Sequence, residues 1–211
     1  MMIGQTNKSL RPDEEKFLME NKEKVITYCD YSNGDVTVCR DLCNALMQHQ
    51  ASVCKIHQDI LGAMTFENRL KISFDQAKEK FLLVALDEKR PIGYIFASTE
   101  HISKERKAFY PFLDKIEKKP GYLGFVPANI KIGAHVGEIG NLFIDPEYRG
   151  FNIGRTLMNR AMDWMKSHKD LECTLVYVSN GNNAGTFYEK YGFHYVNDVM
   201  DGIIKAYELK F

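Results

Sequence analysis

Two arginines and two glycines lie close together in residues 149–155, which read Arg-Gly-Phe-Asn-Ile-Gly-Arg. An apolar run and a turn precede this segment and a periodic amphipathic pattern follows it, so we expect a strand, a loop and a helix in succession. The first N–H groups of a helix lack partners within the helix and lie at the positive end of its dipole. The glycines let a ligand approach the backbone, and Arg149 and Arg155 add positive charge. The segment is therefore predicted to bind a phosphate group.

The loop on its own is weak evidence, because short glycine motifs often occur by chance. A plain strand-to-helix turn explains it equally well. A Walker loop would need G-x-x-x-x-G-K-[ST] and the dinucleotide fingerprint would need G-x-G-x-x-G, and the segment matches neither pattern. A second motif is needed to decide between these interpretations.

The second motif occupies residues 182–193, Asn-Asn-Ala-Gly-Thr-Phe-Tyr-Glu-Lys-Tyr-Gly-Phe, after another apolar run. Together the two motifs resemble the GNAT superfamily of N-acetyltransferases, which transfer an acetyl group from acetyl-CoA to an amine. The family's phosphate loop reads Arg/Gln-x-x-Gly-x-Gly/Ala, so Arg149 and Gly154 match it and Asn152 replaces the first glycine. Asparagine tolerates left-handed backbone angles better than most residues, and the loop shape is therefore expected to persist.

The resemblance implies acetyl-CoA as the acyl donor and no metal ion. Backbone groups of a splayed strand at 141–144 would bind the pantetheine arm and the thioester carbonyl, and Gly140 would ease a bulge there. In the later motif Gly181 holds the place of the family's asparagine, and whether Asn180 or Asn182 contacts the cofactor stays open. The residues expected at the cofactor are Leu142, Phe143, Ile144, Arg149, Gly150, Phe151, Asn152, Ile153, Gly154, Arg155, Asn182 and Tyr188.

Amide formation from a thioester needs a neutral amine, hydrogen-bond donors for the oxyanion and a proton for the leaving thiolate. Tyr188 is the candidate acid, because a phenol carries a proton at neutral pH and the resemblance places this residue beside the sulfur. Tyr191 is expected to pack, and packing is the alternative for Tyr188 too. Glu138 is the candidate base, since its place resembles the catalytic glutamate of histone acetyltransferases. A solvated Glu138, with His135 or water as the base, is the alternative.

The composition is that of an ordinary globular protein, with 45% hydrophobic and 27% charged residues. Lys plus Arg (28) equals Asp plus Glu (28), so no nucleic-acid partner is expected. No apolar run is long enough to cross a membrane and the start lacks the apolar core of a signal peptide, so we expect the cytoplasm and no membrane partner. The five cysteines indicate reduced thiols, and Cys39 and Cys43 are expected to face a core rather than a metal ion.

The hydrophobic pattern predicts the elements that would position these residues. The expected fold class is α/β, with a GNAT-like mixed, mostly antiparallel central sheet flanked by helices on both faces. A single domain is expected over residues 1–211, with a helical N-terminal extension over 1–57 and a cofactor-motif region over about 80–195. Helices are expected at 11–28, about 35–48, 58–79, from 153 onward and at 184–191, and strands at 81–86, 91–98, 133–144, 175–178 and 202–209.

The acceptor is expected to be the primary amine of a small molecule or peptide, attacked directly in a ternary complex. Residues 101–131 join two expected strands by a connection long enough to be functional. Tyr110 and Tyr122 in this connection are the candidates for amine binding, with simple packing as the alternative. A non-catalytic acyl-CoA-binding or sensor module of the same fold, or a structural protein, is the alternative for the whole chain. The motifs leave the oligomeric state open, including a homodimer.

Overall fold

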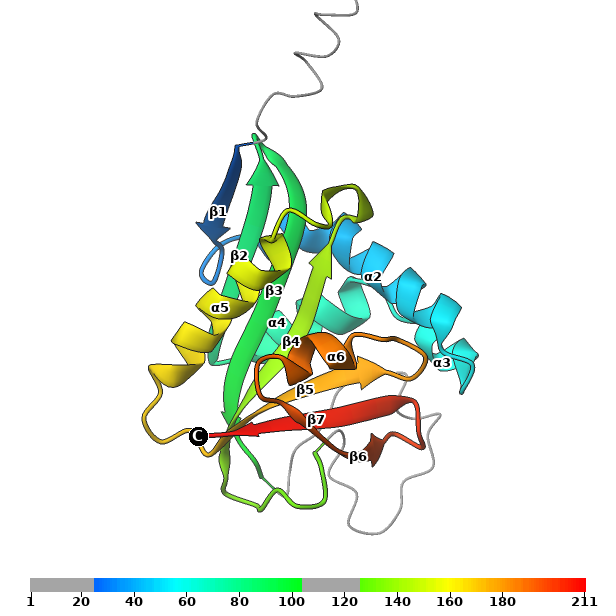
Figure 1. Ribbon diagram of the computed structural model, residues 1–211, viewed down its shortest axis with the longest axis vertical. Coiled ribbons are helices and arrows are strands. Elements are labelled where there is room, and N and C mark those ends of the chain that lie inside the picture. Colours follow the sequence, from blue (N-terminus) through cyan, green and yellow to red (C-terminus); the bar gives the residue numbers. More distant parts are fainter. Residues whose placement is uncertain (1–24, 104–125) are drawn as a thin grey trace, which may run out of the picture.

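The computed structural model describes residues 25–103 and 126–211. Seven strands form one sheet in the order β1-β2-β3-β4-β5-β7-β6 (Figure 1). Every neighbouring pair is antiparallel except β4 with β5, which is parallel, so the predicted mixed, mostly antiparallel sheet is confirmed. The strands are β1 (Ile26–Asp30), β2 (Glu79–Asp87), β3 (Arg90–His101), β4 (His135–Ile144), β5 (Cys173–Ser179), β6 (His194–Val199) and β7 (Ile204–Lys210).

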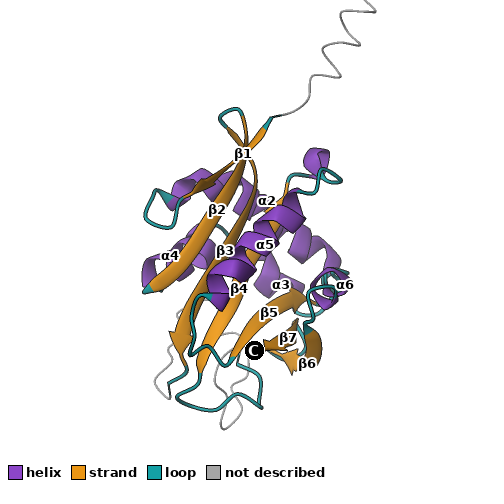
Figure 2. Ribbon diagram, turned by 60° about the vertical axis from the view of Figure 1, so that its left-hand side comes forward, coloured by secondary structure: helices purple, strands orange, loops and turns teal. Residues whose placement is uncertain are grey.

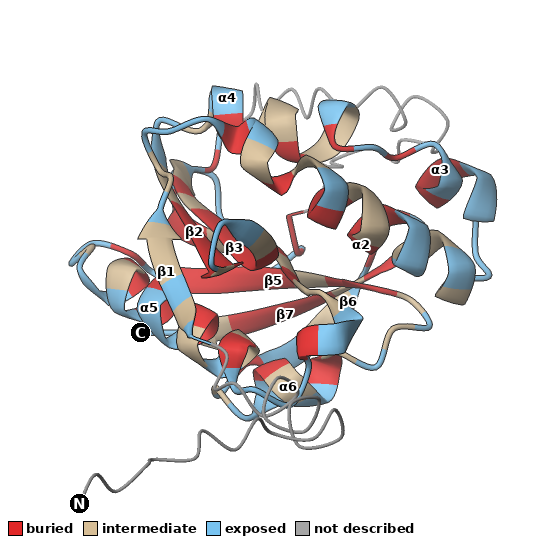
Figure 3. Cartoon of the chain, turned by 90° about the horizontal axis from the view of Figure 1, so that it is seen from above, coloured by how far each residue is buried: buried red, intermediate tan, exposed pale blue. Residues whose placement is uncertain are grey.

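Helices cover both faces of the sheet, as predicted (Figures 2 and 3). The helices α2, α3 and α4 lie on one face, and α5 and α6 lie on the other. None of the helices within the described residues is both long and apolar enough to cross a membrane. The helical segments are η1 (Val36–Cys39), α2 (Arg40–Val53), α3 (Gln58–Gly62), the π-helical turn η2 (Glu67–Lys71), α4 (Ile72–Gln76), η4 (Pro146–Tyr148), α5 (Ile153–Lys166) and α6 (Gly185–Glu189).

Helix α5 packs closely on the sheet because its apolar residues recur at helical spacing. Ile153, Leu157 and Met165 are almost completely buried in one cluster with residues of β2 and β3. A Cβ added to Gly137 of β4 would lie 2.5 Å from the sulfur of Met165, so the glycine leaves room for the Met165 side chain in its present position. The indole of Trp164 stacks on Phe81 at the rim of this contact, with ring centroids 5.8 Å apart. This packing fixes the start of α5 relative to the end of β4.

The strands β4 and β5 pair over only part of their length. Their parallel register runs from Val136 to Ile139, and beyond Ile139 β4 continues beside β3 while β5 continues beside β7. The register of β3 with β4 shifts at Gly140, which is the extra residue of a β-bulge and turns the strand away from its neighbour. Figure 1 shows the two strands diverging. The predicted bulge is confirmed, and it opens a wedge between β4 and β5.

Three local expectations need correction. Residues 26–30 form the edge strand β1 and not the end of a helix, because Ile26 and Tyr28 pack on the α5-side cluster in antiparallel register with β2. Strand β6 was not predicted, and the helix expected at 58–79 is divided into α3, η2 and α4. The expected helix over 11–24 lies outside the described residues.

All five cysteines are free, and Cys39 and Cys43 are completely buried in the cluster beneath α2. The expectation that these two face the core is therefore confirmed. Burial raises the pKa of both thiols above the usual value, because a thiolate loses its hydration inside the core. Burial also raises the pKa of Cys173, to about 12.

Candidate active site

The predicted phosphate loop has the backbone shape that its sequence suggested. Asn152 adopts a left-handed conformation, with φ 60° and ψ 10°, immediately before α5 begins at Ile153. Gly150 is also left-handed, with φ 88°. The prediction that asparagine can replace the family's glycine without loss of shape is therefore confirmed. The loop leaves the first N–H groups of α5 without helical partners.

Two short contacts hold the segment before this loop against the β2–β3 turn. The guanidinium of Arg90 lies 2.6 Å from a carboxylate oxygen of Asp145, and the hydroxyl of Tyr148 donates to Asp87 at 2.5 Å. The hydrogen bond to Asp87 raises the pKa of Tyr148, because the carboxylate favours the protonated phenol. These contacts fix where the loop leaves β4.

The loop and the second motif face one cavity of about 590 Å³. Three cations, Arg149, Arg155 and Lys190, line it together with the start of α5, and none of the described residues that line it is acidic. This combination favours an anion such as a pyrophosphate. The lining residues are Ile144, Tyr148, Arg149, Gly150, Asn152, Ile153, Gly154, Arg155, Asn159, Phe187, Lys190 and Tyr191.

The structure thus brings together seven of the predicted cofactor residues, from Ile144 to Arg155, and separates five others from this cavity. Phe143 is buried on the opposite face of the sheet, and Leu142 packs towards α5, because successive strand residues point to opposite faces. The side chain of Phe151 is half exposed. Asn182 and Tyr188 also lie outside the lining. The backbone of 142–144 still borders the wedge, where the prediction placed the pantetheine arm.

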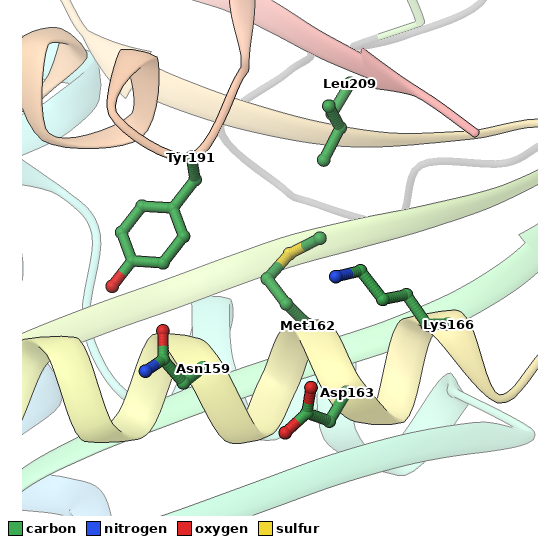
Figure 4. Close-up of a pocket in the computed structure, with 6 residues that line it drawn as sticks. All are labelled: Asn159, Met162, Asp163, Lys166, Tyr191 and Leu209. Atoms are coloured by element: carbon green, nitrogen blue, oxygen red, sulfur yellow. The ribbon is translucent and has the colours of Figure 1, made fainter.

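A second cavity of about 220 Å³ continues along α5 (Figure 4). It shares Asn159 and Tyr191 with the larger cavity, and its remaining lining residues come from α5 and β7. Tyr191 therefore borders both cavities. It was expected only to pack against its neighbours, so this position was not predicted. Its hydroxyl lies 3.5 Å from the carbonyl oxygen of Arg155, so it connects the second motif to the first turn of α5.

The displaced asparagine of the second motif has a physical explanation. Gly181 has φ 84°, and a Cβ at this position would overlap the carbonyl oxygen of Val53 at the end of α2. A side chain here would cost on the order of 1–3 kcal/mol in backbone strain alone. The two asparagines beside Gly181 stabilise the loop instead. The side-chain oxygen of Asn182 accepts a hydrogen bond from the N–H of Ala184 at 3.1 Å, and the side-chain amide of Asn180 donates to the carbonyl of Gly202 at 3.1 Å.

Tyr188 lies on α6 with only 7% of its surface exposed. Phe187 and Phe193 pack edge-on against its ring, with centroids 5.3 and 6.0 Å away. Burial raises its pKa above the usual value, so the hydroxyl keeps its proton at neutral pH. Tyr188 belongs to the same buried cluster as Ile139 of β4 and Val178 of β5, the strands that border the wedge. It can therefore act as a proton donor, but not as a base.

Glu138 lies two residues before the bulge and faces the side of the sheet covered by α4. Its carboxylate is 3.8 Å from the guanidinium of Arg69, and the two side chains are 18% and 12% exposed. Arg69 also donates to the bulge carbonyl of Gly140 at 3.2 Å and to Ser73 at 2.8 Å. Arg69 was not predicted, because nothing in its local sequence distinguishes it from other charged helical residues. It positions both the bulge and the candidate base.

Two buried polar atoms border the wedge on the same face as Glu138. The Oδ1 of Asn141 and the Oγ of Ser179 have no hydrogen-bond partner within the described residues. Their opposite residues in register, Phe96 and Ile204, belong to the cluster beneath α2 and α4, which places both atoms on that face. Buried polar groups are nearly always hydrogen-bonded in proteins, so these atoms mark a place where a polar ligand fits.

The alternative base, His135, lies at the first residue of β4, far along the strand from the phosphate loop. Its Nδ1 is 2.9 Å from a carboxylate oxygen of Asp170, and its ring faces the α5 side of the sheet. Glu138 and His135 therefore face opposite sides, and only Glu138 is next to the bulge. The candidate acceptor residues Tyr110 and Tyr122 lie outside the described residues.

We expect Gly154→Glu to weaken CoA binding about 10-fold or more, because a carboxylate in the cationic cavity would repel a phosphate. The fold should persist, since a Cβ on Gly154 meets only Ile144, at 3.8 Å. Calorimetry with CoA measures the effect. Gly62→Glu is the matched control, because its Cβ would meet nothing within 4 Å and it lies outside the cavity. Equal CoA affinity in the two variants would contradict the phosphate assignment.

Comparisons with known proteins show which sequences and folds this chain resembles. A spermidine N(1)-acetyltransferase of Thermoplasma acidophilum is 42% identical over 72 residues, which cover 34% of this chain and 43% of that protein. The match thus spans less than half of the relative's length.

Solved structures of the same fold cover nearly the whole chain. The PaiA N-acetyltransferase of Thermoplasma acidophilum, in complex with coenzyme A, superposes with a TM-score of 0.56 at 19% identity, over 89% of this chain and 99% of that one. The NatC complex bound to Gag peptide and CoA gives 0.52 at 16% identity, over 88% and 98%. The model of the acetyltransferase (GNAT) family matches residues 50–193, which is most of the chain. The chain therefore belongs to the GNAT acetyltransferase family, as its two motifs predicted.

Proposed function

We propose that the chain transfers an acetyl group from acetyl-CoA to the primary amine of a small molecule or peptide, by direct attack in a ternary complex. The observation that carries this proposal is the cationic cavity at the start of α5, which opens beside the wedge between β4 and β5. Two relatives support the acceptor class. One is named a spermidine N(1)-acetyltransferase, and the other is bound to a peptide and CoA.

In this proposal the cofactor and the acceptor reach the wedge from opposite faces of the sheet. The pyrophosphate binds the N–H groups of the phosphate loop together with Arg149 and Arg155. The pantetheine arm enters the wedge and bonds to the edge of β4 from 142 to 144, which no strand among the described residues covers on the β5 side. The acceptor arrives on the face of Glu138, where Asn141 and Ser179 offer unpartnered polar atoms.

The proton transfers follow from the positions of two side chains. Glu138 accepts a proton from the amine, directly or through a water molecule, and the nitrogen then attacks the thioester carbon. The C–N bond forms, the C–S bond breaks, and the Tyr188 hydroxyl gives its proton to the departing sulfur. The attacking nitrogen loses its surplus proton to solvent, and the Tyr188 phenolate regains a proton from solvent. Arg69 positions Glu138 and holds the bulge. In this scheme Arg69 contacts neither the amine nor the thioester.

The alternative, a CoA-binding module without catalysis, would be favoured if the departures from the family pattern damaged the site. Asn152 keeps the loop shape, and Gly181 is explained by its contact with Val53. The burial of Tyr188 in the cluster that includes Ile139 and Val178, and the position of Glu138 two residues before the bulge, support catalysis over binding alone. The proposal also includes a cytoplasmic location, which the free cysteines support, and a homodimer, for which the sheet edges at β1 and β6 offer pairing surfaces.

The proposed activity is tested by following thiol release from acetyl-CoA with a panel of acceptors. The panel contains spermidine, a short peptide with a free N-terminus and the same peptide with a blocked N-terminus. We expect release with at least one free amine and none with the blocked peptide. CoA binding by calorimetry without release for any amine would support the non-catalytic alternative instead.

Tyr188→Phe should lower kcat about 10²-fold or more while acetyl-CoA affinity stays nearly unchanged, since only a proton donor is lost from a packed ring. The raised pKa of Tyr188 keeps the wild-type phenol protonated, so the deficit should have the same size between about pH 7 and pH 9. Tyr195→Phe is the control for loss of a tyrosine hydroxyl, because Tyr195 is exposed on β6 and lines neither cavity. Equal kcat values for wild type and Tyr188→Phe would refute the acid role.

Glu138→Gln should lower kcat/KM and remove the acidic limb of the pH–rate profile, because the amide cannot take a proton in the pH range of the assay. Glu172→Gln, an exposed glutamate at the start of β5, is the control and should leave the profile unchanged. A Glu138→Gln profile that keeps its acidic limb would assign that limb to another group and leave Glu138 without the role of base.

A further inference from the structure

A second group of reactive side chains lies at the end of the sheet opposite the phosphate loop. His101 is the last residue of β3 and His135 is the first residue of β4, and the two are paired in register. Their rings stack with centroids 4.3 Å apart and planes 22° apart. Asp170, in the connection between α5 and β5, adds a carboxylate 2.9 Å from the Nδ1 of His135. One nitrogen or oxygen atom from each of the three residues lies within 4.8 Å of the others.

We propose that His101, His135 and Asp170 bind a divalent transition-metal ion, with Zn²⁺ as the best fit. Two imidazoles and one carboxylate are ligands that Zn²⁺ accepts readily, and a water molecule would complete four-fold coordination. Ligand atoms around tetrahedral Zn²⁺ lie about 3.4 Å apart, given bonds of about 2.0–2.2 Å. The three groups therefore need to close by little more than 1 Å. His101 and Asp170 are exposed and can make that adjustment, while His135 is fixed by burial.

The surroundings keep the three segments in place around the site. The N–H of Glu172 donates to the carbonyl of His135 at 2.9 Å, which joins the start of β5 to the start of β4. The N–H of Ile102 donates to the carbonyl of Ala134 at 2.9 Å, directly beyond the two histidines. His168 packs edge-on against His135 with centroids 6.4 Å apart, and its Nδ1 lies 2.9 Å from the carbonyl oxygen of Trp164. The site thus combines one rigid ligand with two adjustable ligands.

Two other histidine–acid pairs on the described surface, at His57 and His194, lack this arrangement. His57 lies 3.0 Å from Asp201, and His194 lies 3.5 Å from Glu208, but each is a pair without a second imidazole. Within residues 25–103 and 126–211, the group at His101 is the one in which three potential ligands meet. The pair at His57 is therefore a suitable control, because it has the same ion-pair chemistry and no third ligand.

The position of the site indicates a structural role outside the transfer reaction. His101 and His135 are the two ends of the connection from β3 to β4, so a bound ion would join the ends of that loop. Closing a long loop in the unfolded chain costs entropy, and a cross-link at its ends reduces that cost in folding. The ion would also fasten the α5–β5 connection to the same point through Asp170.

The test is calorimetric titration of tag-free, chelator-treated protein with ZnCl₂, supported by the visible absorption spectrum of Co²⁺ as a tetrahedral reporter. We expect one ion per chain, a dissociation constant of about 10 μM or tighter, and a rise in Tm with the metal. His101→Ala and Asp170→Asn change exposed side chains, so both should fold. Each should weaken binding about 10-fold or more and abolish the tetrahedral Co²⁺ spectrum.

The control His57→Ala should bind Zn²⁺ as the wild type does. Absence of binding to the wild-type chain would overturn the proposal, as would affinities for His101→Ala and Asp170→Asn equal to that of His57→Ala. Circular dichroism of each variant establishes that it is folded before its titration is compared. His135→Gln is a further variant, to be compared only if its spectrum matches that of the wild type. Acetyl transfer is not measured in this experiment, so its result is independent of the proposed enzymatic activity.

Discussion

The short parallel contact between β4 and β5 is the constraint on which the rest of the site depends. Parallel pairing extends only from Val136 to Ile139, and the extra residue Gly140 then turns β4 towards β3. Continuous pairing would satisfy every backbone group and leave no edge for a ligand. Beyond the bulge, β4 therefore lacks hydrogen bonds to β5, and an opening between the two strands takes their place. Arg69 supports this local distortion by binding the carbonyl of Gly140.

The opening divides the chemistry between the two faces of the sheet. Cations and helical N–H groups gather on the side of α5 and α6, where no acidic residue within 25–103 or 126–211 lines the cavity. The carboxylate of Glu138 and the unpartnered atoms of Asn141 and Ser179 lie on the side of α2 and α4. Under the proposed function, an anionic cofactor and a cationic amine would be attracted to different faces and would meet where the strands separate.

The sequence predicted the parts of this arrangement that depend on local pattern. The β2–β3 hairpin, β4 and α5 were recognisable from continuous apolar runs and helical spacing. The bulge was implied by the family resemblance, and Gly140 made it easier to form. Strand β6 carries no such pattern, because only Val199 among its residues is buried. β1 is a short edge strand whose apolar residues are also compatible with a helix. Arg69 and the group of His101, His135 and Asp170 depend on tertiary packing and strand register, so no sequence spacing reveals them.

The buried cysteines have a consequence for the proposed acetyl transfer, which would release a free thiol at every turnover. Thiol–disulfide exchange requires a thiolate, and burial holds Cys39, Cys43 and Cys173 in the thiol form. A disulfide of CoA near the protein therefore meets few cysteine thiolates in the core that could react with it. Self-inactivation by mixed disulfides is disfavoured, and Cys29, which is only partly buried, is the first position at which such an adduct would form.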